Sequence, residues 1–304
     1  MENLCDAHLH FFTRDVLRFY ARQSAEYREL EDPATQVADR LGISPPPPAP
    51  QDLAALWVAE LERYHVSRAL LFGSVPGEQQ AISQAVAAFP HKFVGFQMLN
   101  PLDPDAERTT NDIAARGLRG LLLFPAMHRF FPDDPACMKT CRLAKQHGLI
   151  VFVHVGPLRI VIQEKLGSSS TIQSSYGDPQ RLSKVLQAFP EIPFIVPHFG
   201  CGLLASVLES ARQTRNLYLD TSSSNSWMQQ RQEFSNLEKV FGKILEEKAF
   251  GPERLLFGSD STVFPRGWRK EIYQAQRAAL DHLGVSSSEK QLIFSGNLER
   301  LLAA

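Results

Sequence analysis

The sequence has no excess of charge of either sign. Its 304 residues include 32 Lys and Arg against 33 Asp and Glu, which gives a formal net charge of −1. A chain with such a balance has no excess of positive charge that would attract nucleic acid or an anionic membrane surface. A small-molecule substrate is therefore the expected partner, and association into a homodimer is left open.

Long apolar runs are also missing, and cysteine is scarce. No stretch approaches the roughly 20 residues that a membrane helix needs, and the chain begins with NLCDAHLHFF at residues 3–12, without the basic flank and cleavage site of a secretory signal. The four cysteines, Cys5, Cys137, Cys141 and Cys201, are scattered, which favours free thiols over disulfides. The expected location is the cytoplasm.

Strand-like and helix-like segments alternate along the whole chain. Continuous apolar runs such as LIVFVHVG at 149–156 are typical of parallel strands that are buried on both faces. The alternation reaches eight strands, each followed by a helix, which predicts an α/β fold of the (β/α)8 TIM-barrel type. An open doubly wound sheet is the alternative, but no G-x-G-x-x-G motif follows the first strand.

Two segments interrupt this alternation. Residues 11–50 follow the first strand and contain four consecutive prolines, Pro45–Pro48, which predict a stiff connector. Residues 157–178 follow the fifth strand. Loops on this side of a barrel surround the active site, so we expect residues 11–50 to form a lid; a subunit contact is the alternative. The tail at 286–304 is expected to form a helical cap on a single domain of residues 1–304.

The first strand carries a pair of histidines. In the stretch DAHLH at residues 6–10, His8 and His10 are two positions apart. Side chains alternate in a strand, so both imidazoles point to the same side and can bind one metal ion. Taken alone, this pair is as readily explained by surface polarity or by hydrogen bonding in the core.

Three further candidates end other predicted strands. His154 ends the fifth strand in VFVHVG, His198 ends the sixth in FIVPHFG, and Asp260 ends the eighth in LLFGSD. In a closed barrel the carboxyl ends of the strands meet on the catalytic face. Five such residues in one register therefore predict a metal centre rather than isolated core polar groups. The other histidines, among them His128, are expected at the surface.

Taken together, these motifs and the late GNLERLL resemble the amidohydrolase superfamily, in particular its amidohydrolase 2 branch, over residues 4–302. That branch includes aminocarboxymuconate-semialdehyde decarboxylase, aromatic-acid decarboxylases, and lactone and amide hydrolases. The resemblance implies that His8, His10, His154 and Asp260 bind a divalent metal and that His198 transfers protons. Imidazole and carboxylate donors suit zinc, which is the first choice.

One departure from the superfamily bears on the number of metal ions. Binuclear members carry a lysine on the fourth strand that becomes carbamylated and bridges two metals. This chain has Gly120, Leu121 and Leu122 there, and the neighbouring Arg119 cannot form a carbamate. One metal ion is therefore expected.

The leading interpretation is a metal-dependent hydrolase that uses a metal-activated water to cleave an amide, a lactone or a ring carbonyl bond, with His198 and Asp260 as catalytic residues. A non-oxidative decarboxylase of a carboxylated ring is the alternative, and a catalytically silent barrel is a third. The side chains expected to contact substrate are Arg14, Phe124, Tyr176 and Trp227.

Overall fold

Eight parallel strands follow one another around the protein in chain order, so that each strand pairs with the next one along the sequence. The computed structural model describes residues 3–168, 171–223, 225–230 and 232–303. The strands are β1 (Leu4–His10), β2 (Val66–Gly73), β3 (Phe93–Met98), β4 (Gly120–Leu123), β5 (Ile150–Val153), β6 (Phe194–Val196), β7 (Leu217–Asp220) and β8 (Leu255–Leu256).

Backbone hydrogen bonds close this sheet into a barrel. The Ala7 N–H donates to the Phe257 carbonyl at 2.7 Å, and the Asp260 N–H donates to the His8 carbonyl at 2.9 Å. These contacts join the first strand to the segment that continues β8, so the two edges pair with each other. The predicted (β/α)8 barrel is confirmed, and the open doubly wound sheet is excluded.

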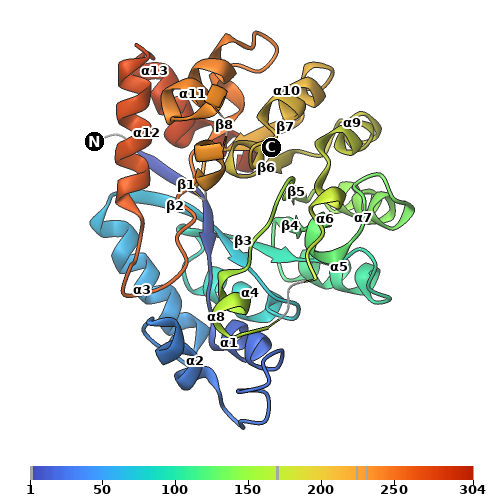
Figure 1. Cartoon of the computed structure of the whole chain (residues 1–304), viewed down its shortest axis with the longest axis vertical. Helices are drawn as coiled ribbons and strands as arrows, with labels where there is room; N and C mark the ends of the chain where they lie inside the picture. The colour runs from blue at the N-terminus through green and yellow to red at the C-terminus, as the bar shows by residue number, and fades with distance from the viewer. Residues whose placement is uncertain (1–2, 169–170, 224, 231, 304) are drawn as a thin grey trace.

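A helix follows each strand and covers the outside of the barrel (Figure 1). In chain order these helices are α3 (Pro50–Arg63), α4 (Gln79–Ala88), α5 (Ala106–Ala115), α7 (Pro135–Gln146), α9 (Pro179–Ala188), α10 (Leu204–Arg212), α11 (Leu237–Glu246) and α12 (Lys270–His282). The additional helices are α1 (Arg14–Ala21), α2 (Ala34–Leu41), α6 (Pro125–His128), α8 (Val161–Lys165), α13 (Ser287–Gln291) and α14 (Asn297–Ala303).

The C-terminal helices form the predicted cap. Asn297, from the GNLERLL motif, begins α14, and its side-chain amide donates to the Leu255 and Pro252 carbonyls at 2.8 Å each. This amide thereby holds the short strand β8 in place. No helix in the described part of the chain is long and apolar enough to cross a membrane.

Aromatic side chains fill the barrel beneath the first histidine. The Phe72 and Phe152 rings lie 4.9 Å apart, and their centroids are 4.8 and 5.3 Å from that of His8. Both phenylalanines are fully buried, because the strands that carry them are covered on both faces. This packing fixes one side of the His8 imidazole.

The insertion after β1 is packed into the fold. Val16, Leu17 and Tyr20 of α1 are buried in the same apolar cluster as Phe72 and Phe124 at the strand ends. The insertion begins with the helix α1, after which the chain makes turns over residues 22–29. Figure 1 shows α1, α2 and α8 gathered at one end of the protein, so the two insertions meet there.

Truncation of Leu17 to alanine is expected to lower the free energy of unfolding by about 2–5 kcal/mol, because the side chain is fully buried and its removal leaves a cavity. Denaturant unfolding measures this change. Leu30, in the same insertion but 42% exposed, is the matched control, and its replacement by alanine should cost less than about 0.5 kcal/mol. Equal small losses in both variants would contradict a packed insertion.

Candidate metal centre and active site

Three side chains, two from β1 and one from the segment that continues β8, form a compact donor group, which we call the first group. His8 Nε2 lies 3.1 Å from His10 Nε2, and Asp260 Oδ1 lies 3.6 Å from the former and 3.4 Å from the latter. Ligand atoms that share one ion at about 2.0–2.2 Å stand at separations of this order. The three residues therefore fit a single divalent cation.

Hydrogen bonds turn the two imidazoles toward this group. His8 Nδ1 lies 2.5 Å from Asp220 Oδ2, and His10 Nδ1 lies 2.7 Å from Ser74 Oγ. If each Nδ1 carries the proton and donates it, the Nε2 lone pairs point toward each other. This is the arrangement in which histidine binds a metal, with a carboxylate or hydroxyl supporting the far nitrogen.

The charges in the group also suit a cation. Burial lowers the pKa of His8 to about 4, so this imidazole is neutral at neutral pH. Burial alone would raise the pKa of Asp260, but the His10, His8 and His198 rings outweigh it and hold this pKa well below its usual range. Burial raises the pKa of Asp220 to about 7, so a cation nearby would favour its ionised form.

Two less conspicuous residues hold the backbone around this group. The Asp6 carboxylate accepts from the His8 N–H at 2.9 Å and from the Ser259 N–H at 3.0 Å, so it ties β1 to the loop that carries Asp260. A Cβ at Gly258 would lie 2.3 Å from Asp220 Oδ1. Only glycine fits where this backbone passes the carboxylate.

A second donor group lies beside the first. It contains His154, His198 and Cys201. These residues are 4%, 6% and 6% exposed, respectively. Cys201 Sγ lies 3.7 Å from His154 Nε2. His154, which the family resemblance implies as a ligand together with His8, thus stands in this group and not in the first.

His198 is held by a chain of hydroxyl and carboxylate contacts. Ser222 Oγ lies 2.8 Å from His198 Nδ1 and donates to Asp220 Oδ2 at 2.9 Å. The serine oxygen can therefore accept the proton of His198 Nδ1, which leaves Nε2 as the reactive nitrogen. Burial lowers the pKa of His198, and its ring centroid lies 5.0 Å from that of His8.

Two of the predicted substrate contacts lie at the site. The Phe124 ring is stacked on the His154 ring at 5.9 Å. Trp227 is buried against the loop that carries the second group, because a Cβ at Gly202 would lie 3.4 Å from its Cβ. The Trp227 indole nitrogen has no hydrogen-bond partner among the described residues. Phe124 therefore borders the histidine cluster, whereas Trp227 borders the turn that follows Cys201.

The other two predicted contacts are engaged elsewhere. The Arg14 guanidinium donates to the Pro46 carbonyl at 2.8 Å and pairs with Asp32 at 3.5 Å, both within the insertion. The Tyr176 ring packs on Phe131 at 4.6 Å. No contact to the donor groups is found for either side chain among the described residues. In this structure Arg14 ties the insertion together.

Different arginines stand next to the carboxylate of the first group. Arg269 donates to Ser223 Oγ, which in turn donates to Asp260 Oδ2 at 3.3 Å. Arg266 is exposed, and its guanidinium donates to Thr262 Oγ1. Desolvation and the charge of Arg269 lower the pKa of Arg266, while Asp260 acts in the opposite direction. Arg269 has an ion pair with Glu271, but no carboxylate of the described residues pairs with Arg266.

The first group has one exposed side. The side chains of His10 and Asp260 are 19% and 15% exposed, whereas that of His8 is 3% exposed. The open side of this group is therefore formed by His10 and Asp260, and Ser223 and Arg269 lie next to Asp260 there.

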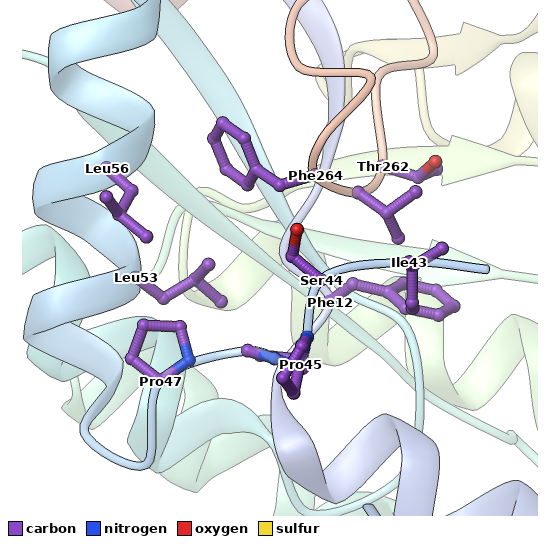
Figure 2. Close-up of a pocket in the computed structure, with 11 residues that line it drawn as sticks. Phe12, Ile43, Ser44, Pro45, Pro47, Leu53, Leu56, Thr262 and Phe264 are labelled. Atoms are coloured by element: carbon purple, nitrogen blue, oxygen red, sulfur yellow. The ribbon is translucent and has the colours of Figure 1, made fainter. Parts of the chain in front are cut away.

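A small apolar pocket lies behind these strand ends (Figure 2). The proline connector, α3 and the loop after β8 face one another around it, with Pro45, Leu53 and Phe264 among the lining residues. Phe12 and Thr262, each two residues beyond a donor of the first group, also line it. It has no charged lining residue, so it is unsuited to an anionic substrate.

Sequence reasoning missed four residues of the site. Asp220, Ser222 and Cys201 support or join the donor groups, and Arg269 stands at their open side. Asp220 had a usable signal, because it ends β7, much as His154 directly follows β5. His128 was also assigned wrongly to the surface: it is half-buried, and burial lowers its pKa to about 4.

The barrel with histidines and a carboxylate at its strand ends defines a class of metal-dependent enzymes. The chain belongs to the amidohydrolase family, whose sequence model matches residues 5–303. It is an enzyme of that family, whose members include hydrolases and decarboxylases. No curated protein matches this chain.

Solved structures share the whole fold at low sequence identity. The 5-carboxyvanillate decarboxylase from Sphingomonas paucimobilis is 18% identical, with 99% of each chain covered and a TM-score of 0.66. A dihydroxybenzoic acid decarboxylase from Polaromonas sp. JS666, with bound manganese and 2-nitroresorcinol, is 18% identical over 100% of this chain and 97% of its own, with a TM-score of 0.65. An amidohydrolase from Burkholderia multivorans with bound zinc is 16% identical over 99% of each chain, with a TM-score of 0.65.

Proposed function

We propose that the protein is a metal-dependent, non-oxidative decarboxylase of a carboxylated ring. His8, His10 and Asp260 would hold one divalent ion, and His154 would join them by turning away from Cys201. The donor separations near 3.1–3.6 Å support this assignment, and related structures contain manganese or zinc. When bound, the ion would polarise the substrate oxygens and draw negative charge toward itself.

In this proposal His198 supplies the proton that replaces the carboxylate. Its Nε2 takes a proton from water or from an acidic group of the substrate and delivers it to the ring carbon that bears the carboxylate. A C–H bond forms, the C–C bond to the carboxylate breaks with its electrons returning to the ring, and carbon dioxide leaves. Ser222 keeps the ring oriented through Nδ1.

The observation that carries the proposal is the pair of arginines near Asp260, Arg266 and Arg269, which we call the cationic edge. Arg266 has no carboxylate partner among the described residues, and Arg269 reaches the same edge through Ser223. A guanidinium pairs well with a carboxylate. This chemistry favours an anionic, carboxylated substrate over a neutral amide.

Replacement of Arg266 by glutamine is expected to raise KM for such a substrate about 10- to 100-fold, since a hydrogen bond to a charged group contributes about 1.5–3 kcal/mol. Steady-state kinetics measures the change. Arg108→Gln is the control, because that side chain is 78% exposed on α5 and paired with Asp105. Equal KM values in the wild type and in Arg266→Gln would remove the cationic edge from the proposal.

A turnover assay tests the reaction itself. The metal-loaded protein is incubated with a panel of hydroxylated aromatic carboxylates, lactones and amides, and released carbon dioxide is measured beside each organic product. Carbon dioxide in equal amount to a decarboxylated ring is the expected result. A new carboxylate or amine without carbon dioxide would overturn decarboxylation.

Hydrolysis, the leading interpretation from the sequence, is the second candidate, because the amidohydrolase family also includes hydrolases. His198 Nε2 would then take a proton from the attacking water and return it to the leaving group. Both reactions use the same donors, so the product analysis above decides between them.

A further inference from the structure

Glu78 is a buried carboxylate in the loop between β2 and α4. The residue is 2% exposed, and burial raises its pKa to about 7. The charge of Asp15 acts in the same direction, so it does not compensate for the burial. Glu78 is the N-cap residue of α4, but its side chain makes no capping hydrogen bond to that helix in the described structure. A carboxylate is costly to bury, and capping of α4 does not account for this one.

The carboxylate joins two segments that border the metal donors. Its Oε1 accepts from the Thr13 hydroxyl at 2.6 Å, and its Oε2 accepts from the Ser74 N–H at 2.7 Å and the Val75 N–H at 3.1 Å. Thr13 is the N-cap of α1, where its oxygen accepts from the Asp15 N–H at 3.2 Å. One carboxylate therefore fastens the start of the insertion to the loop after β2.

Ser74 extends this connection to a donor of the first group. Its Oγ lies 2.7 Å from His10 Nδ1, while Glu78 holds the backbone N–H of the same serine. A hydroxyl or carboxylate at the far nitrogen orients an imidazole that binds a metal. The chain thus leaves His10, reaches Thr13 three residues later, and is tied back through Glu78 to the serine that contacts His10.

We propose that Glu78 is a positioning residue of the metal centre, which holds Ser74 so that the His10 imidazole stays turned toward the ion. Through Thr13, it makes this orientation depend on the placement of the insertion. The inference rests on the metal centre of the proposed function. Glu78 neither reaches the ion nor exchanges a proton in this role. A change at the start of the insertion would therefore alter metal binding without removing a metal ligand.

Isothermal titration of the full-length, metal-free protein with zinc tests this role. Glu78→Ala is expected to bind zinc about tenfold more weakly, the lower end of the range for a partner that supports a ligand, because it acts through Ser74. Glu78→Gln should restore most of the affinity, since its side-chain oxygen can still accept from the Ser74 N–H. Glu247→Ala, which removes a carboxylate paired with Arg212 after α11, is the control and should not change the affinity.

A double-mutant cycle separates positioning from a general structural role. If Glu78 acts through the Ser74 hydroxyl, Glu78→Ala should cause little further loss of zinc affinity in a protein that already carries Ser74→Ala. Co²⁺ gives the spectroscopic readout, because its visible d–d bands respond to ligand geometry. These bands should shift in Glu78→Ala and stay in place in Glu247→Ala. Additive losses of affinity together with unshifted bands would overturn the positioning role.

Thr13→Val tests the link to the insertion. It removes only the hydroxyl that reaches Glu78, so a smaller loss of zinc affinity is expected, and this loss should also vanish in the Ser74→Ala background. Thr110→Val is the matched control, because that buried hydroxyl donates to the Ala106 carbonyl within α5. Unchanged affinity in Thr13→Val would overturn the link.

The outcomes separate this proposal from the proposed function. Absence of zinc and manganese binding in the wild type would overturn the metal centre itself. Zinc binding that is equal in the wild type and in Glu78→Ala would overturn the positioning role and leave the metal centre intact. Far-ultraviolet circular dichroism checks that each variant is folded. If Glu78→Ala is not, Thr13→Val takes its place in the cycle with Ser74→Ala.

Discussion

His198→Ala is expected to keep its metal and to lose about 10²- to 10⁴-fold in kcat, the usual contribution of a positioned proton carrier. The imidazole is buried beside the first donor group, and its Nδ1 is occupied by Ser222, so Nε2 is the nitrogen available for proton transfer. Metal analysis and steady-state kinetics on the same preparation measure the two effects separately.

Ser222→Ala is the companion variant for His198. It removes the hydroxyl at Nδ1 but leaves the imidazole, so a smaller loss of kcat and a shifted pH profile are expected. If His198→Ala folded normally but lost its metal, His198 would be a ligand, as its place in the second donor group allows, and the proton carrier would have to be sought elsewhere.

His8→Ala is expected to lose both metal and turnover. His8 Nε2 is within 3.1 Å of His10 Nε2 and 3.6 Å of Asp260 Oδ1, so its removal leaves only two donors of the compact group. A partner that supports a ligand is typically worth about 10- to 100-fold in metal affinity, and a direct donor is expected to exceed about 100-fold. Isothermal titration with zinc and with manganese measures the loss.

Asp220→Asn is expected to weaken metal binding less than His8→Ala does. The amide keeps the shape of the side chain but removes the charge that His8 Nδ1 faces at 2.5 Å, so a loss of about 10- to 100-fold in metal affinity is expected. His91→Ala, at an exposed position, is the matched control for histidine removal. Unchanged zinc and manganese affinity in His8→Ala would show that the ion, if bound, is held by other residues.

The sequence by itself determined the barrel and the compact part of its site. Continuous apolar strands alternating with amphipathic helices leave few folds that bury both faces of a parallel sheet. The two-residue spacing of His8 and His10 places both on one side of a strand, and Asp260 follows the strand that must pair with it. Local periodicity is enough for these three, because His8 and His10 lie on one face at the end of β1 and Asp260 lies in the segment that continues β8.

Only the tertiary structure decided the partners of those residues. Asp220 meets His8 across 212 positions of sequence, and Cys201 reaches His154 through a turn with positive φ that no periodicity encodes. Likewise, Arg14 follows His10 closely in the sequence, but its guanidinium is bonded to the Pro46 carbonyl. Arg269, far away in the sequence, instead reaches the site through Ser223. Loop side chains are directed by long-range packing and hydrogen bonds, and these contacts exist only once the barrel has closed.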